Sequence, residues 1–170
     1  FAYSQPCEFP SENGQIRPLG VWAGTSWEDI GKEVKERLDG QPQLFIGDGE
    51  IAMEKWLGGL AKDKQRCDWH LARDSGVMLW HDGAPKGERD STRQKLSRLL
   101  AIEIPEKDIE MVSEADREKL LERIKNAEKE ILELRQQFMQ KGYSKAATYL
   151  ENARKHLFTH LNLWIETGIV

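Results

Sequence analysis

A stripe of apolar residues between residues 113 and 141 limits the possible folds of this chain more than any other feature. The intervals alternate between four and three residues, which keeps the side chains on one face of a helix: Leu120, Ile124, Ala127, Ile131, Leu134 and Phe138. Ser113 and Asp116 match a helix cap before the stripe, and Lys141-Gly142 is a typical helix end. The sequence therefore predicts one long helix with an apolar seam.

A second apolar stripe follows this helix. Its residues have matching spacing: Ala146, Leu150, Ala153, Leu157, Leu161 and Trp164. Two such helices can bury their stripes against each other, so we expect a long antiparallel helical hairpin over residues 113–166. The same spacing also permits a coiled-coil homodimer, in which the stripe packs on a second chain. Both alternatives remain open at the level of the sequence.

The first half of the chain alternates between strand and helix patterns. Strands are expected over residues 15–22, 43–47 and 64–69, and an amphipathic helix follows each of them. The first helix has a cap at Ser26 and Asp29 and stops at Asp39-Gly40, and the second should end early at Gly58-Gly59. This alternation favours a parallel sheet layered with helices. We expect an α/β core over residues 1–82 and a mostly helical part over residues 83–170.

Composition excludes several classes of protein. With 170 residues, 39% of them apolar, the chain can form one moderate globular domain or a small domain with an appendage. No segment approaches the roughly 20 apolar residues that a membrane span needs. Cys7 and Cys67 are too few for a disulfide framework. These features predict a soluble cytoplasmic protein with no membrane contact.

Charge is unevenly distributed along the chain. The net charge of -4 argues against a nucleic-acid coat over the whole surface, but the second half is close to neutral and has local basic stretches. One stretch lies on a basic amphipathic helix expected over residues 88–101, and it comprises Lys86, Arg89, Arg93, Lys95 and Arg98. Such a cluster is either a solvated helix face or a contact surface for phosphate groups.

Asp48 follows the apolar strand at residues 43–47. Ligands of parallel sheets bind at the carboxyl ends of the strands, and a carboxylate at such an end can bind a hard cation such as Mg²⁺. Asp48-Gly49 is also a common turn, and Asp48 can cap a helix that starts at Glu50. The residue type and position are consistent with both roles.

Cys67 and His70 form a Cys-x-x-His pair after the third expected strand. Together with His156 and His160 they have the ligand types of a zinc site, although a long segment separates the two pairs. Alternatively, Cys67 ends the strand in the core, as free cysteines often do, and His70 starts the next helix. A Cys/His hydrolase would also need an oxyanion loop, for which the sequence offers no candidate.

Three segments, in this order, resemble the catalytic core of the DDE transposases of bacterial and archaeal insertion sequences, including the Mutator-like group. They are GVWAGTSWEDIGKEV, IGDGEIAMEKWL and QRCDWHLARD, and the resemblance covers roughly residues 17–100. It implies an RNase H-like fold with a mixed sheet, interrupted by a helical insertion between the second and third catalytic acids. The helices of residues 83–170 would belong to this insertion.

The resemblance also implies roles for individual residues. Asp48 matches the second catalytic acid and would bind Mg²⁺ or Mn²⁺ in the intact enzyme, while Cys67 and His70 would support the site. The intact enzyme would cleave and transfer DNA strands. The basic residues that would contact DNA are Lys86, Arg89, Arg93, Lys95 and Arg98.

The chain departs from the family pattern at two catalytic positions. Before Asp29 the only carboxylates are Glu8, Glu12 and Glu28, so no Asp matches the first acid. Glu166 is the only late candidate for the third acid. Several carboxylates are needed to hold two cations, which predicts an inactive fragment. The alternative function is a helical protein-interaction or dimerisation module on an α/β base, without catalysis.

Overall fold

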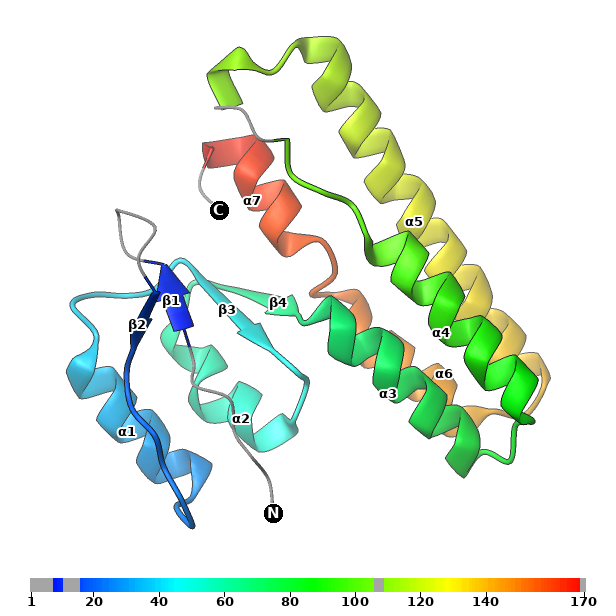
Figure 1. Cartoon of the computed structure of the whole chain (residues 1–170), viewed down its shortest axis with the longest axis horizontal. Coiled ribbons are helices and arrows are strands. Elements are labelled where there is room, and N and C mark those ends of the chain that lie inside the picture. The colour runs from blue at the N-terminus through cyan, green and yellow to red at the C-terminus, as the bar shows by residue number, and fades with distance from the viewer. Residues whose placement is uncertain (1–7, 11–15, 106–108, 169–170) are drawn as a thin grey trace. The chain divides into compact units, whose positions relative to one another are not determined.

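The computed structural model describes residues 8–10, 16–105 and 109–168, and the chain divides into two compact units, residues 1–63 and 64–170 (Figure 1). The described chain is mostly helical and contains a small two-stranded parallel sheet, so its class is mixed α/β. Within the described ranges, no helix combines the length and the apolar character that crossing a membrane requires. Cys7 and Glu12 lie outside the described residues.

The first unit has a small core between two helices and a strand. Helix α1 (Trp27–Arg37) starts as predicted, because the Ser26 hydroxyl accepts a hydrogen bond of 3.2 Å from the amide of Asp29. Strand β3 (Leu44–Gly47) and helix α2 (Ile51–Trp56) follow, and a 3₁₀ turn at Gly58–Leu60 confirms the early end of α2. The core residues come from these elements: Ile30, Val34, Phe45, Met53 and Leu57.

The sheets are smaller than the sequence predicts. Strand β3 pairs with β4 (Asp63–Arg66), the strand in which the first unit ends, while β1 (Glu8–Pro10) pairs antiparallel with β2 (Ile16–Pro18) in a separate sheet. The strand expected over residues 15–22 therefore ends at Pro18, which has no amide proton to donate. Ile46 is 60% exposed, so only one face of the apolar strand expected at residues 43–47 is buried. An RNase H-like fold remains a prediction.

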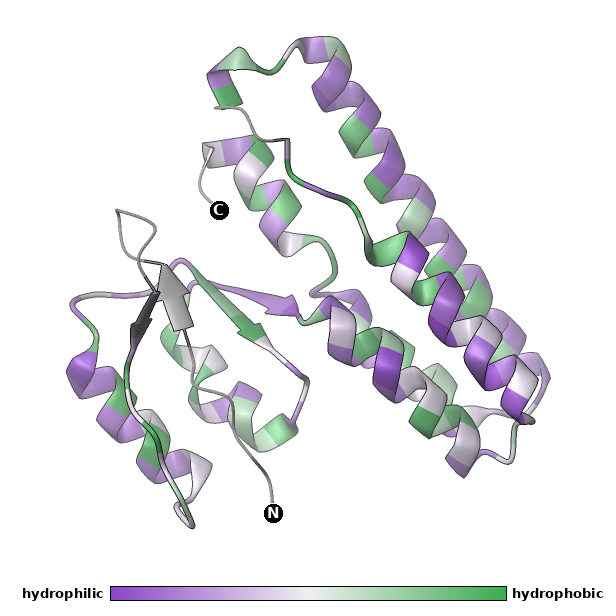
Figure 2. Cartoon of the chain, viewed as in Figure 1, coloured by the Kyte–Doolittle hydropathy of each residue, from purple (hydrophilic) through white to green (hydrophobic). Residues whose placement is uncertain are grey.

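The second unit is a helical domain with its own core. It comprises α3 (Asp68–His81), α4 (Lys86–Leu100), α5 (Glu114–Gln140), α6 (Ser144–Arg154) and α7 (Thr159–Thr167), with a 3₁₀ turn at Ile109–Met111. All six residues of the α5 stripe are buried in one cluster with residues of the other helices. Figure 2 shows the resulting bands of hydrophilic and hydrophobic residues along α5. The apolar stripe is therefore covered within the chain itself.

The boundary between the two units differs from the predicted boundary after residue 82. Helix α3 packs against α4 and α6, and Leu71 and Leu79 are fully buried in the core of the second unit. Composition changes only after this helix, whereas the burial of its apolar face places it with the helices that follow. The helical domain therefore begins at Lys64.

The second arm of the predicted hairpin is not one helix. Helix α6 ends at Arg154 and α7 begins at Thr159, and Phe158 between them has a positive φ of 55°. A bulky residue rarely adopts this backbone conformation, but the Phe158 side chain is fully buried, and that burial offsets the strain. The apolar stripe continues through Leu157 and Leu161 across the break.

One acidic side chain, Asp82, joins two helices at one end of the helical domain. The Asp82 carboxylate accepts hydrogen bonds from the amides of Lys145 (3.3 Å) and Ala146 (2.9 Å), in the first turn of α6. These amides would otherwise lack partners, because the residue before α6, Tyr143, provides no side-chain cap. Asp82 therefore connects the end of α3 to the start of α6.

Replacing Asp82 by Ala should lower the free energy of unfolding by about 1 kcal/mol, the typical effect of losing a helix cap. Asp82→Asn should lose less, because the amide oxygen still accepts hydrogen bonds. Urea unfolding followed by circular dichroism measures both changes. Asp90→Ala is the control, since it removes an acidic side chain of α4 and leaves Asp82 at the start of α6 in place. An equal loss in Asp82→Ala and Asp90→Ala would contradict the capping role.

Candidate nucleic-acid interface

Asp48 lies directly after β3, and its side chain turns back to its own loop. The carboxylate accepts a hydrogen bond of 2.9 Å from the amide of Glu50, and α2 begins at Ile51. This is the local turn that an Asp-Gly pair commonly forms before a helix. Of the two roles consistent with the sequence, the structure shows the turn, with the helix starting one residue later than expected.

The described residues do not fit a pair of divalent cations. They contain no group of three or more His, Cys, Asp or Glu side chains that could hold a metal ion. Glu166, the candidate for the third acid, is exposed on α7 in the second unit, whereas Asp48 belongs to the first unit. Two cations need several shared carboxylates, and Asp48 alone does not provide them.

Cys67 and His70 contact each other in the first turn of α3. The Cys67 Sγ lies 3.1 Å from Nδ1 of His70, and Cys67 occupies the N-cap position. His156 and His160 contribute main-chain groups nearby: the His156 carbonyl accepts from the Arg66 amide at 2.8 Å. Since no group of three metal-binding side chains forms in the described ranges, the predicted pairs do not combine into a zinc site there.

Gln65 is a buried hydrogen-bonding residue at the start of the helical domain. Its Nε2 donates to the Arg66 carbonyl (2.7 Å) and to Asp68 Oδ1 (3.3 Å), and its Oε1 accepts from the His160 amide (3.3 Å). Burial raises the pKa of Asp68 to about 6, although the bond from Gln65 favours the charged form. Burial also lowers the pKa of His160. Sequence patterns did not identify Gln65 and Asp68, because their burial arises only from helix packing.

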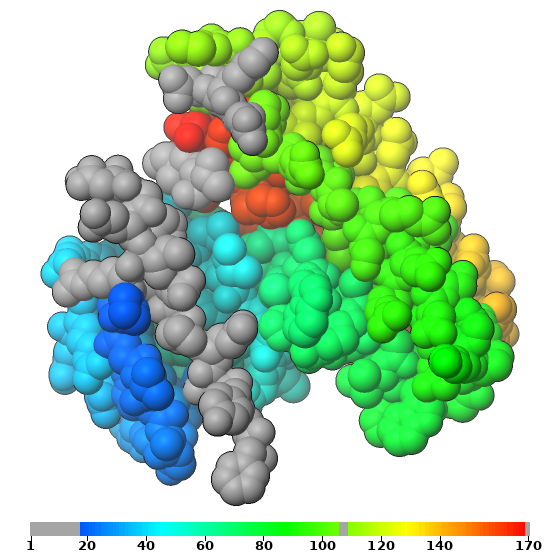
Figure 3. Space-filling view, viewed as in Figure 1, coloured from blue at the N-terminus to red at the C-terminus, as the bar shows by residue number. Residues whose placement is uncertain are grey.

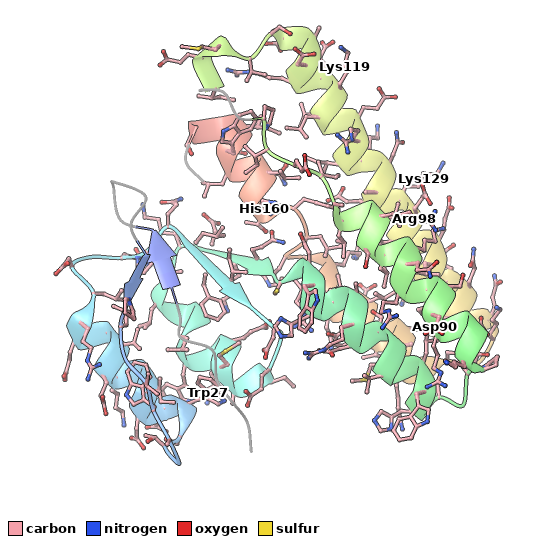
Figure 4. The ribbon with its side chains drawn as sticks, viewed as in Figure 1. Trp27, Asp90, Arg98, Lys119, Lys129 and His160 are labelled. Carbon is pink, nitrogen blue, oxygen red and sulfur yellow. The ribbon has the colours of Figure 1, made fainter. Side chains whose placement is uncertain are left out.

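The five predicted DNA contacts on α4 differ in accessibility. Lys86, Arg93 and Arg98 are exposed, and Arg98 is labelled in Figure 4. Lys95 is half-buried, and its Nζ lies 3.1 Å from a carboxylate oxygen of Glu130 on α5. Arg89 is also half-buried, and its Nε is inaccessible to solvent.

A shallow, open depression lies on the exposed face of α4. Its lining consists of Arg93, Gln94, Ser97 and Arg98. Within the part of the chain that the structure describes, these side chains bring two guanidinium groups, an amide and a hydroxyl to one surface. All four can donate hydrogen bonds to an anion.

One acid of α4 is neutralised by contacts with other helices. The Glu88 carboxylate accepts hydrogen bonds from Lys141 and, at 3.0 Å, from the Tyr143 hydroxyl. The bond from Lys141 is the main reason that the pKa of Glu88 is lowered. The negative charge of Glu88 is thus balanced by Lys141, and the three exposed cations of α4, Lys86, Arg93 and Arg98, outnumber its one other acid, Asp90.

Comparison with known proteins yields no relative of this chain: no protein-family model, curated protein or solved structure matches it.

Replacing Asp68 by Asn should change the pH dependence of stability. Because the folded-state pKa is above the ordinary 3.8, the wild-type protein loses stability as the pH rises from about 4 to about 6. The Asn variant cannot ionise, so it should gain about 1 kcal/mol over wild type at neutral pH and little below pH 4, allowing for the partial exposure of Asp68. Urea unfolding at several pH values measures the difference.

The variant His160→Gln tests a pH dependence of stability of the opposite sign. Burial disfavours the charged imidazole, so the wild-type protein loses stability as the pH falls below the ordinary His pKa of 6.5. The Gln variant should not show this loss. A stability difference between Asp68→Asn and wild type that is independent of pH would contradict the raised pKa of Asp68.

Proposed function

We propose that this chain is the DNA-binding part of a DDE-type transposase, and that α4 contacts the phosphate backbone of duplex DNA. The exposed cationic face of α4 carries the proposal. It presents Lys86, Arg93 and Arg98 to solvent, with Gln94 and Ser97 between the two arginines. The resemblance of residues 17–100 to the transposase core supplies the family.

The residue types on α4 suit phosphate better than a base edge or an apolar ligand. A guanidinium group can donate two parallel hydrogen bonds to phosphate oxygens, and amide and hydroxyl groups commonly make further backbone contacts. Lys86 and Arg98 are separated by about 18 Å along the helix, the length of about five base pairs of duplex. Such contacts position DNA without reading its sequence, and their strength depends on salt.

The proposal assigns strand cleavage and transfer to the intact transposase and not to the described residues alone. Asp48 would be the second catalytic acid, as the resemblance implies, and its carboxylate accepts a hydrogen bond from the Glu50 amide. Mg²⁺ or Mn²⁺ would be the cofactor of the intact enzyme, for which further carboxylates are required. The chain itself contributes DNA binding.

The alternative function, a dimerisation module, has less support. It requires the α5 stripe to be available for a second chain, and all six residues of that stripe are buried inside the helical domain.

Replacing Arg93 and Arg98 together by Gln should weaken the binding of a short labelled DNA duplex by about tenfold or more at low salt. Because two phosphate contacts are lost, the slope of log affinity against log salt should decrease by about two. Fluorescence anisotropy over a salt series measures both quantities. The matched control is Arg123→Gln with Lys125→Gln, which removes two exposed cations from α5.

Two results would contradict the proposal. In the first, the Arg93 and Arg98 variant binds the duplex as tightly as wild type. In the second, the α5 control weakens binding equally, which would show a general effect of net charge and no specific role of α4.

A further inference from the structure

One face of α3 exposes two tryptophan side chains. Trp69 is 63% exposed and Trp80 is 58% exposed, whereas Leu71 and Leu79, which point into the core, are fully buried. The two tryptophans are eleven residues apart, which is close to three helical turns and places them on the same side of α3. Large aromatic side chains gain most by burial, so two of them exposed in line indicate a binding surface.

Neighbouring side chains hold the rings of this surface. The Arg73 guanidinium lies 4.6 Å from the centre of the Trp69 ring, and the His70 ring meets the Trp69 ring edge-on with centres 4.8 Å apart. Trp80 has a similar neighbour in His81, with ring centres 4.7 Å apart. Each tryptophan is therefore supported by a ring or a cation, while more than half of its surface remains exposed.

The tryptophan surface borders the side of α4 that carries Arg93. The two helices pack along each other, and a Cβ atom added at Gly76 would lie 4.0 Å from the Arg89 carbonyl oxygen. With about 100° per residue, Trp69 and Trp80 lie within about 40° of Gly76 around α3. On α4, Arg93 is one turn from Arg89 and lies on the same side. Figure 3 shows that both helices reach the surface of the face in view.

We propose that α3 and α4 together bind single-stranded DNA, with bases stacked on Trp69 and Trp80 and phosphates contacting the cations of α4. This inference rests on the proposed function and names the form of DNA that the surface accepts. Every base has a flat aromatic face, so separated tryptophans beside a basic surface suit single strands of any sequence. The two rings are about 16 Å apart along the helix, which leaves room for nucleotides between them.

The composition of the surface favours single-stranded DNA over a protein partner. Val77, at 43% exposure, is the one exposed large aliphatic residue of α3 in the described chain, so the exposed apolar surface of this helix consists mainly of the two tryptophan rings. Asp74 accepts hydrogen bonds from Arg73 Nε (2.5 Å) and Nη2 (3.0 Å), which balances its charge. Lys86, Arg93 and Arg98 give the adjoining helix the positive charge that complements a polyanion.

The double variant Trp69→Ala/Trp80→Ala tests the inference. Its affinity for a labelled oligo(dT) strand should fall by at least about tenfold, because each stacked base is lost. Its affinity for duplex DNA of the same length should stay within about twofold, since the cations of α4 are unchanged. Trp69→Phe/Trp80→Phe should retain most of the affinity for oligo(dT), as phenylalanine also stacks on bases. Fluorescence anisotropy gives all these affinities.

A base analogue provides a direct signal for stacking. An oligo(dT) strand with one 2-aminopurine should lose fluorescence when it binds the wild-type protein and much less when it binds Trp69→Ala/Trp80→Ala. The matched control is Leu121→Ala/Met139→Ala, which removes exposed apolar side chains from α5 and should leave binding unchanged. Circular dichroism melting checks that each variant remains folded.

The outcomes separate this inference from the proposed function. If the Trp69 and Trp80 variant binds oligo(dT) as well as wild type while duplex binding persists, stacking is wrong and the proposed function stands. If wild type binds neither oligo(dT) nor duplex, both are wrong. If the variant changes only the mass of the protein in solution, the tryptophans form a protein interface and the inference is overturned.

Discussion

Burial of the apolar stripe of α5 is the interaction on which the helical domain depends. Each fully buried Leu, Ile or Phe contributes about 1.5–3 kcal/mol, and this stripe joins residues of all the other helices of the domain in one core. Helices α4 and α6 pack on α5, and α3 packs on α4 and α6. Because the inner faces of α3 and α4 are buried in this core, their outer faces expose the residues to which we assign DNA binding.

Local sequence patterns predicted those features of the structure that depend on interactions between residues close in the chain. The caps at Ser26 and Ser113 form hydrogen bonds within four residues, and both were readable from the sequence. The break at Phe158 was not readable, since the apolar spacing continues across it and only its backbone is unusual. The place of α3 in the second unit was missed because composition does not show which helices cover Leu71 and Leu79.

In the candidate site, too, the sequence shows the residue types but not the contacts that the fold gives them. The sequence at Asp48-Gly49 is consistent with a catalytic acid and with a turn residue, and only the bond to the Glu50 amide reveals the turn. Lys95 looks equivalent to Arg93 in the sequence, but it pairs with Glu130 on a helix that is distant in the chain. Sequence patterns did not single out Trp69 and Trp80, because their exposure follows from the packing of α3.

The apolar stripe of α5 is buried within one chain, which leaves the outer faces of α3 and α4 available to a ligand. Light scattering at several protein concentrations should therefore give a mass of 19.6 kDa that does not change with concentration. A mass that rises towards twice this value would contradict burial within one chain, because the stripe would then be the interface of a helical dimer.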